Sequence, residues 1–224
     1  MRAPISVIVP TLNAEHQLGI CLGALLPGLE AGLIREVIVS DGGSADATVA
    51  VARAWGAEVV SGAASRGGQL RRGCDGAQGA WLLVLHADTA LAPDWVGPVV
   101  QHLETDRAGW FRLAFTRGGL AGRFVAGWAN LRSLLGLPYG DQGLLLPRAL
   151  YQAVGGYPDQ PLMEDVAIAR ALRGRLARIE AVAGTSPERY RSQGWLRRGA
   201  RNLWTLLRYF AGVDVSVLAR QYRR

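Results

Sequence analysis

The sequence predicts an α/β fold, with a doubly wound, mostly parallel sheet that is flanked by helices. Three observations lead to this fold class. The chain has 224 residues, half of them apolar, which is enough to bury a full core. Short β-branched or leucine-rich runs alternate with helix-like stretches through the first half. Glycine and proline are spread along the chain, so no linker or low-complexity tract divides it.

The first half is a series of strand and helix patterns. The expected strands are short apolar runs ending at polar or glycine-rich residues, as buried parallel strands do, at residues 5–9, 36–40, 58–61 and 81–85. Helices are expected between them at residues 14–26, 45–55 and 67–78. Ser44 is the expected N-cap of the second helix. Ligands bind beyond the carboxyl ends of such strands, which directs attention to residues 10–13, 41–44 and 86–89.

The second half is less regular. Strands are expected at residues 110–115 and 143–146, and helices at residues 120–135 and 164–173. The clearest element is a helix over residues 195–212, in which apolar residues recur at spacings of four, three, four and three: Leu196, Ala200, Leu203, Leu207 and Phe210. The opposite face carries Arg197, Arg198, Arg201 and Arg208. The pattern predicts a C-terminal basic amphipathic helix.

The net charge of +7 is concentrated in the C-terminal part of the chain. Residues 1–185 hold equal numbers of arginines and acids, so the whole excess follows residue 185. Every basic residue is arginine, which suits bidentate phosphate contacts, and we expect a phosphate-bearing partner. Two interpretations of the basic helix stay open: its apolar face covers the domain while its arginines are solvated, or it lies on an anionic membrane surface.

The composition excludes several classes of protein. No apolar run reaches the roughly 18 residues of a membrane-spanning helix, and no signal-peptide pattern occurs, so a cytoplasmic protein is expected. Cys21 and Cys74 lack metal-ligand spacing and are expected to be buried thiols. The chain contains no lysine, which excludes a P-loop, and Pro-Thr-Leu-Asn follows the first strand where a dinucleotide site has Gly-x-Gly-x-x-Gly.

Carboxylates at the strand ends are the candidate site residues. Asp41 is followed by two glycines that permit close approach of a ligand, and it can accept a hydrogen bond from a base; the alternative is that it stabilises its own turn. Asp88 is placed to hold a divalent cation that bridges two phosphates, or else to cap a helix over residues 91–103. His86 either assists Asp88 or packs at the strand end.

Glu164 and Asp165 open a short predicted helix. The helix dipole stabilises carboxylates at this end, which supports a structural role. In a catalytic role, one carboxylate acts as general base on an acceptor hydroxyl while the other orients a group or holds the shape of the site. The residues alone leave both roles open.

Six segments in order resemble family 2 glycosyltransferases of the GT-A, Rossmann-like fold, over about residues 5–175. The segments are Ser6-Val7-Ile8-Val9-Pro10-Thr11-Leu12-Asn13, residues 36–48 around Ser40-Asp41-Gly42-Gly43-Ser44, Leu83-Val84-Leu85-His86-Ala87-Asp88-Thr89, Gly140-Asp141-Gln142-Gly143, Gly155-Gly156-Tyr157 and Met163-Glu164-Asp165. The chain looks most similar to a short bacterial subfamily, called selenodomain-associated, in which His-Ala-Asp-Thr replaces the usual Asp-x-Asp.

The resemblance implies an inverting transfer from a nucleoside diphosphate sugar, assisted by a divalent cation, Mn²⁺ or Mg²⁺. Asp165 is then the favoured base beside Glu164, and Asp88 with His86 forms the metal site. The implied donor-binding residues are Pro10, Thr11, Asn13, Asp41, Gly42, Arg66, Gln69, Ala87 and Asp88. The implied acceptor-binding residues are Gly140, Asp141 and Gln142.

On this interpretation, residues 1–185 form the nucleotide-sugar-binding and catalytic domain, and residues 186–224 form a basic amphipathic extension packed on or beside it. The expected partners are the sugar donor and an acceptor, lipid-linked if the extension contacts an anionic membrane on its inner face; no nucleic acid is expected. Two alternatives are a sugar nucleotidyltransferase, which usually has a glycine-rich, basic loop that this chain lacks, and a non-catalytic sugar-nucleotide-binding module.

Overall fold

The computed structural model describes residues 3–222, except for the side chain of Arg189. The strands of this part form one eight-stranded sheet in the order β3-β2-β1-β4-β7-β6-β8-β5. The strands are β1 (Ile5–Thr11), β2 (Ile34–Asp41), β3 (Glu58–Ser61), β4 (Trp81–Val84), β5 (Thr89–Leu91), β6 (Ala108–Phe115), β7 (Leu144–Pro147) and β8 (Leu176–Thr185). The first four are parallel, and β7 runs antiparallel between β4 and β6. The predicted fold class is confirmed.

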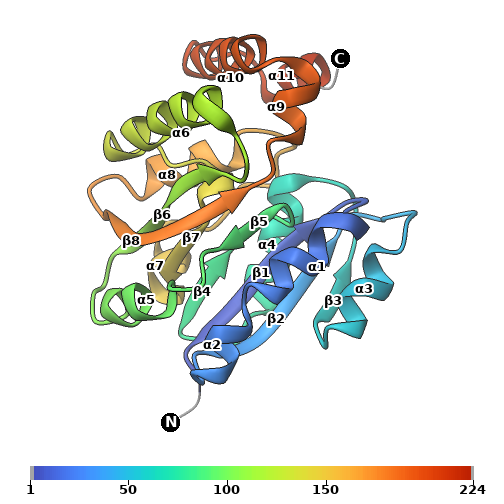
Figure 1. The fold of residues 1–224 in the computed structure, drawn as a ribbon, viewed down its shortest axis with the longest axis vertical. Helices are drawn as coiled ribbons and strands as arrows, with labels where there is room; N and C mark the ends of the chain where they lie inside the picture. The colour runs from blue at the N-terminus through green and yellow to red at the C-terminus, as the bar shows by residue number, and fades with distance from the viewer. Residues whose placement is uncertain (1–2, 223–224) are drawn as a thin grey trace.

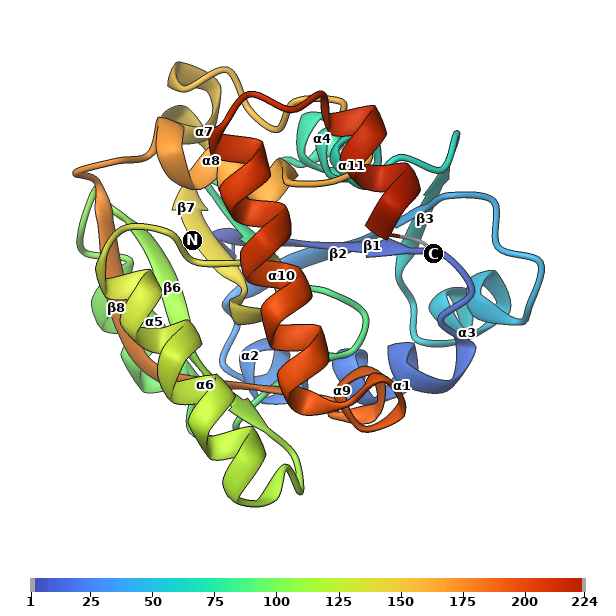
Figure 2. The same ribbon diagram turned by 90° about the horizontal axis from the view of Figure 1, so that it is seen from above.

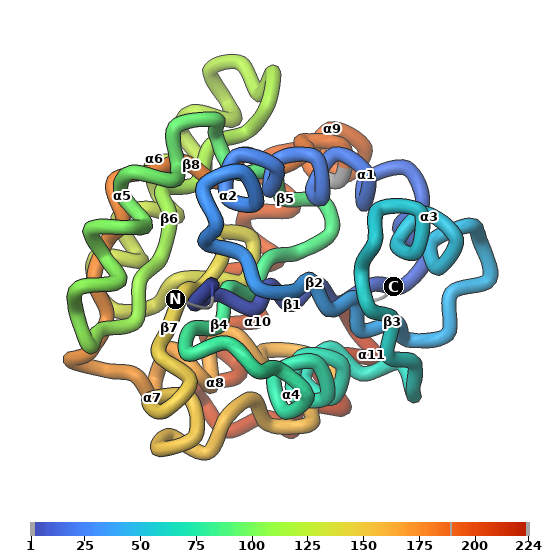
Figure 3. Tube along the Cα trace, turned by 90° about the horizontal axis from the view of Figure 1, so that it is seen from below, coloured from blue at the N-terminus to red at the C-terminus, as the bar shows by residue number. Residues whose placement is uncertain are grey.

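Helices cover both faces of the sheet (Figures 1 and 3). They are α1 (Glu15–Gly23), α2 (Leu26–Glu30), α3 (Thr48–Ala54), α4 (Arg66–Gly76), α5 (Val96–His102), α6 (Gly119–Leu134), α7 (Arg148–Ala153), α8 (Glu164–Ala171), α9 (Glu188–Gln193), α10 (Trp195–Phe210) and α11 (Val215–Tyr222), with a 3₁₀ turn, η1, at Gly140–Gln142. Side chains alternate along a strand, so Val7 and Val9 pack with Leu18 on one face while Ile8 packs with Leu70 on the other.

Two helices of the first half begin or end differently from the prediction. The expected helix over residues 14–26 is divided into α1 and α2. The expected N-cap at Ser44 is wrong, because α3 begins only at Thr48. The Ser44 hydroxyl instead donates a 2.5 Å hydrogen bond to Asp41, so the turn after β2 uses Ser44 before the helix starts.

Two strands of the second half differ from the sequence-based expectation. β8 pairs in parallel with β6 and antiparallel with β5, and neither β8 nor β5 is predicted. Charged residues such as Arg178 and Glu180 interrupt the apolar pattern of β8. The position of β5 also shows that Asp88 does not cap a helix over residues 91–103, because a strand follows Asp88 directly and α5 begins only at Val96.

The C-terminal helices lie above the carboxyl ends of β1 and β4 (Figure 1, top). Leu206 of α10 and Leu218 of α11 pack with Leu162 and Val166, which joins these helices to the rest of the chain. No helix in the described part is long and apolar enough to cross a membrane. Cys21 and Cys74 are buried free thiols, as expected.

The interpretation that α10 packs through its apolar face is wrong. The predicted apolar residues Leu196, Leu203, Leu207 and Phe210 are all exposed, whereas Thr205 and Leu206 are buried. The helix turns a different face inward because it covers a polar cavity, into which Arg198 and Asn202 reach.

Candidate functional site

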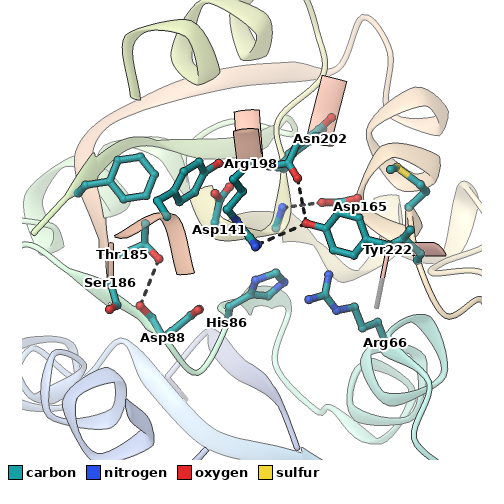
Figure 4. Close-up of a pocket in the computed structure, with 16 residues that line it drawn as sticks. Arg66, His86, Asp88, Asp141, Asp165, Thr185, Ser186, Arg198, Asn202 and Tyr222 are labelled. Atoms are coloured by element: carbon teal, nitrogen blue, oxygen red, sulfur yellow. Dashed lines mark hydrogen bonds between the residues drawn. The ribbon is translucent and has the colours of Figure 1, made fainter. Parts of the chain in front are cut away.

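Two adjoining cavities lie between the strand ends and the C-terminal helices. The larger measures about 660 Å³, a size typical of small-molecule sites, and contains residues that follow β1 and residues at the start of α4. The smaller measures about 110 Å³ and lies beside η1 and the start of α8 (Figure 4). The residues that line both cavities are Arg66, His86, Asp88, Leu162, Ser186, Arg198 and Tyr222.

Most of the predicted donor-site residues come together in the larger cavity. Those that line it are Pro10, Thr11, Asn13, Arg66, Gln69, Ala87 and Asp88. Asp41 and Gly42 lie behind its wall and do not line it. The strand ends therefore converge as the topology of a parallel sheet requires, although one predicted carboxylate is set back from the cavity.

Asp41 organises the turn that shapes this wall. Its carboxylate accepts hydrogen bonds from the backbone N–H groups of Gly43 and Ser44 at 2.8 Å each, and from the Thr11 hydroxyl at 3.0 Å. Burial by itself raises the pKa of Asp41, but the hydrogen bonds from Ser44, Gly43 and Thr11 outweigh it and hold that pKa below its ordinary value. Asp41 is therefore an anion whose bonds fix the turn, while Asn13 reaches across the same turn to bond with Ala45.

Gln69 ties α4 to two strand ends. Its side-chain amide donates to the carbonyl of Thr11 at 2.7 Å and to that of Ser40 at 3.0 Å. A Cβ at position 42 would lie only 2.9 Å from the Gln69 amide oxygen, so glycine allows the turn to approach α4 closely. Gln69 thus lines the cavity while using both amide hydrogens to support it.

Asp88 and His86 lie on the wall that the two cavities share. The carbonyl of Asp88 accepts hydrogen bonds from the Thr185 hydroxyl and the Ser186 N–H, both at 3.4 Å, which attach this loop to the end of β8. The imidazole of His86 packs so closely on Gly140 that a Cβ there would collide with it. His86 therefore contacts η1 while it also lines both cavities.

Asp88 also fits a cation that is shared with a bound phosphate. Among residues 3–222, no cluster of three or more histidine, cysteine or carboxylate side chains could hold a metal ion by itself. Mg²⁺ is commonly bound by one or two carboxylates together with substrate phosphates, so Asp88 can serve as the protein ligand when the phosphates supply the others. A cation held in this way would neutralise charge on a diphosphate.

Glu164 and Asp165 are neighbours in the chain but face different cavities. Glu164 lines the larger cavity, is 1% exposed, and its Oε2 has no hydrogen-bond partner among the described residues. Burial, followed by the charge of Asp165, raises the pKa of Glu164 to about 7, and Arg66 opposes the rise. Asp165 lines the smaller cavity, where its Oδ2 accepts a hydrogen bond from the Gly140 N–H at 3.0 Å.

The residue before this pair has a strained backbone. Met163 has a φ of 63°, in the left-handed region that is uncommon for residues other than glycine. Such conformations persist only where the surrounding structure enforces them, and they are frequent at functional sites. Here the left-handed turn starts α8 directly at Glu164, which places both carboxyl groups at the cavities.

The predicted acceptor residues divide into two groups. Gly140 and Asp141 line the smaller cavity. Burial raises the pKa of Asp141 to about 6; Arg132 opposes this rise, and the charges of Asp165 and Asp88 add to it. Gln142 lines neither cavity, because it is fully buried and its Oε1 accepts hydrogen bonds from Ser133 at 2.5 Å and from the Tyr139 N–H at 3.2 Å. It holds the shape of η1.

The residues that form the roof of the cavities are not among those that the sequence predicts. Arg198 donates to the Tyr222 hydroxyl at 3.3 Å, and Tyr222 donates to Asn202 at 2.9 Å (Figure 4). Arg198 also donates to Gln193 at 2.8 Å. The Nε of Arg198 is buried and has no hydrogen-bond partner among the described residues. The signal in the sequence is the spacing of Arg198 and Asn202, four residues apart and therefore on one helix face.

A family model described as glycosyl transferase family 2 matches residues 6–124, more than half of the chain. The chain belongs to glycosyl transferase family 2. As a glycosyltransferase of this family it has both the fold and the order of strand-end motifs that its sequence predicts. No curated protein sequence matches the chain.

Solved structures of similar fold agree with the family. The S. aureus TarS 1–349 structure is 16% identical with a TM-score of 0.64, and the match covers 84% of this chain and 62% of TarS 1–349. Glucosyl-3-phosphoglycerate synthase from Mycobacterium tuberculosis, solved with Mn²⁺, uridine diphosphate and phosphoglyceric acid, is 24% identical with a TM-score of 0.57, covering 82% of this chain and 69% of that one. This glycosyltransferase thus spans less than two thirds of TarS 1–349 and shares its GT-A fold.

Proposed function

We propose that this glycosyltransferase binds a nucleoside diphosphate sugar in the larger cavity and transfers the sugar to an acceptor hydroxyl in the smaller one. The observation that carries this proposal is the arrangement of two carboxylates around the junction of the cavities. Asp88 lies on the shared wall, and Asp165 lines the smaller cavity. A sugar at the junction would have its diphosphate on the Asp88 side and its acceptor on the Asp165 side.

In this proposal the donor lies along the strand ends. The base and ribose contact the wall made by Pro10, Thr11 and Asn13, supported from behind by Asp41 and Gly42, with Gln69 beside them. Arg66 faces the diphosphate, and the backbone at Ala87 continues the wall. Related structures with uridine diphosphate and with UDP-GlcNAc support a nucleotide-sugar donor.

A divalent cation, Mn²⁺ or Mg²⁺, would be held by Asp88 with assistance from His86, and would neutralise the departing diphosphate. The M. tuberculosis synthase with Mn²⁺ supports this assignment. Arg66 and Arg198 line the same wall and supply positive charge of their own. The leaving group would therefore be stabilised by arginines as well as by the ion.

The chemical step in this proposal is an inverting single displacement. Asp165 takes the proton of the acceptor hydroxyl, whose oxygen forms a bond to the anomeric carbon on the face opposite the leaving group. The bond from that carbon to the phosphate oxygen breaks, and its electron pair leaves with the nucleoside diphosphate. The N–H of Gly140 holds Asp165 in place. Gly140 and Asp141 contact the acceptor, and Gln142 maintains the shape of their turn. Glu164 orients the donor from the larger cavity.

The proposal also concerns the division of the chain, its subfamily and its location in the cell. Residues 1–185 are proposed as the catalytic unit and residues 186–224 as an extension that closes the site through Arg198 and Tyr222. We also propose that the enzyme belongs to the short bacterial selenodomain-associated subfamily, which the His86-Ala87-Asp88-Thr89 segment supports, and that it acts in the cytoplasm.

The test uses a panel of nucleoside diphosphate sugars with Mn²⁺ or Mg²⁺ and follows the release of nucleoside diphosphate. At least one donor should be consumed by the wild-type chain and not by Asp165→Asn. Consumption of nucleoside triphosphate with a sugar phosphate, and of no sugar nucleotide, would contradict the proposal and indicate a nucleotidyltransferase.

A further inference from the structure

Helix α6 presents a continuous apolar stripe to solvent. Its packed face consists of small residues, Gly122, Ala126, Ala129 and Ser133. Its outer face carries large apolar side chains that are 50% to 82% exposed: Leu120, Phe124, Trp128, Leu131, Leu134 and the following Leu135. Buried small residues with exposed large ones reverse the usual amphipathic pattern of a surface helix. The outer face of α6 therefore has no role in the core.

Helix α10 has an outer stripe of the same kind. Arg198, Asn202 and Leu206 point toward the cavity and the body of the protein. The outer stripe, 44% to 82% exposed, consists of Leu196, Leu203, Trp204, Leu207 and Phe210. The apolar residues of this helix are thus on the side away from the domain, which leaves them free to contact something outside it.

The two stripes are neighbours. Trp195 at the start of α10 packs on α6, where a Cβ at Gly122 would lie 3.0 Å from its ring, and Trp195 also meets Phe115 edge to face at 5.1 Å. Figure 2 shows α10 and α6 next to each other on the side of the molecule that faces the viewer. We call the two stripes together the α6/α10 apolar face. Monomeric soluble proteins rarely expose a continuous apolar surface of this extent without a partner.

The charge around this face is mostly positive. Residues 117–135 and 189–213, which contain both helices, hold nine arginines and neither aspartate nor glutamate, and the exposed acids Glu188 and Asp214 lie at the borders of the second range. Arg123 and Arg197 are exposed beside the stripes, whereas Arg201 and Arg208 bond to Gln221 on α11. An exposed apolar stripe with tryptophan and phenylalanine, edged by arginine, matches the interface of a membrane that carries anionic lipids.

We propose that the α6/α10 apolar face seats the enzyme on an anionic membrane surface, with the stripes in the headgroup and acyl boundary and the arginines against lipid phosphate. A second copy of the chain fits less well, because it would bring mostly arginines against arginines, with only the flanking Glu188 and Asp214 to pair them. If the proposed function holds, the inner side of α10 then places the acceptor cavity next to the bilayer, where a lipid-linked acceptor would be within reach.

The test is co-sedimentation of the whole chain with vesicles of phosphatidylglycerol and phosphatidylcholine, and with vesicles of phosphatidylcholine alone. The wild type should bind the anionic vesicles more strongly. The triple variant Phe124→Ser, Trp128→Ser, Trp204→Ser should lose at least about tenfold in partitioning, because it no longer transfers three large apolar side chains out of water. A matched control, Ile20→Ser, Leu29→Ser, Trp55→Ser, removes exposed apolar groups from α1, from α2 and from the residue after α3, and it should bind as the wild type does.

A double variant, Arg123→Gln with Arg197→Gln, tests the contribution of the arginines to membrane binding. It should abolish the preference for anionic over neutral vesicles. Undiminished binding by the triple variant, or equal losses in the triple variant and its control, would overturn the proposal. A wild type that forms a dimer through this face and ignores vesicles would also overturn it. Nucleotide-sugar binding is measured on the same variants in solution, so a failure of the proposed function is seen separately.

Discussion

The carboxylate of Asp165 lies 3.0 Å from the backbone nitrogen of Gly140 and accepts its hydrogen bond. This contact joins the start of α8 to η1, two segments that are 25 residues apart. It holds one oxygen of Asp165 in place at the smaller cavity, while the other accepts from the Val166 N–H at 2.7 Å. A carboxylate held by two backbone donors is well positioned to receive a proton from a substrate.

Asp165→Asn should lower kcat by a factor of about 10² or more and leave donor affinity nearly unchanged. Asparagine keeps an oxygen that can accept from Gly140 and loses the acceptor that faces the Val166 N–H, so most of the local geometry survives while the base is lost. Steady-state kinetics with a saturating donor measure this. Unchanged kcat with a raised KM for the donor would make Asp165 a binding residue. Glu164→Gln is the control, and it should act mainly on donor affinity.

Asp88→Asn should abolish transfer in a folded protein and remove the effect of Mn²⁺ on nucleotide binding. The reason is that the carboxylate is the charged ligand available on the shared wall for a cation bound to diphosphate. Calorimetric titration of nucleoside diphosphate with and without Mn²⁺ checks the second effect. His86→Gln should reduce the effect of Mn²⁺ on nucleotide binding far less than Asp88→Asn does. Full turnover by Asp88→Asn would remove the residue from the mechanism.

Arg198→Gln should weaken nucleotide binding by about tenfold, which corresponds to one lost charge-assisted hydrogen bond. Its Nε has no partner among the described residues, and the side chain lies in the wall of both cavities. Tyr222→Phe removes the neighbouring hydroxyl but no charge, and it is the matched control. If the two changes lowered nucleotide affinity equally, Arg198 would act only by holding Tyr222 in place and not by contacting the nucleotide.

Glu164 should make the protein less stable as the pH rises. Its pKa is about 7 in the folded chain against an ordinary 4.5, so it favours folding fully below about pH 4.5 and loses this contribution as the pH rises to about 7. The free energy of unfolding of Glu164→Gln should therefore exceed that of the wild type by on the order of 1–3 kcal/mol at about pH 8, and by little at about pH 5. Thermal unfolding at both pH values measures this, and an equal difference at the two would contradict the assignment.

The sequence predicts the donor side of the site better than the roof. The strands β1, β2 and β4 each contain a short, largely apolar run that ends at polar or glycine-rich residues, so the sequence alone places the residues at their ends together. The sequence alone cannot show whether Asp41 lines the cavity or lies behind its wall, because its position depends on three hydrogen bonds within its own turn and one from Thr11 on β1. For Asp88, the helix-cap alternative is excluded only by the pairing of β5 with β8.

The roof escapes prediction because helical periodicity indicates that a helix has two faces but not which one is turned inward. In α10 the inward face contains Arg198 and Asn202, since the surface that it covers is a polar cavity. Leu203 and Leu207, which the pattern assigns to the core, are exposed. The choice of face depends on tertiary contacts with α6 and α11, and these are not local in sequence.

The proposed donor site is tested most directly by thermal unfolding of the wild type and of Asp88→Asn with a panel of nucleoside diphosphate sugars, with and without Mn²⁺. We expect at least one donor to raise the Tm of the wild type, more with Mn²⁺ than without. A ligand at a concentration of about 100 times its Kd raises the free energy of unfolding by about 2.7 kcal/mol, which is readily measured. The additional rise with Mn²⁺ should be absent in Asp88→Asn. If no donor stabilised the wild type, or if Mn²⁺ stabilised both proteins equally, the assignment of a metal-assisted nucleotide-sugar site would be contradicted.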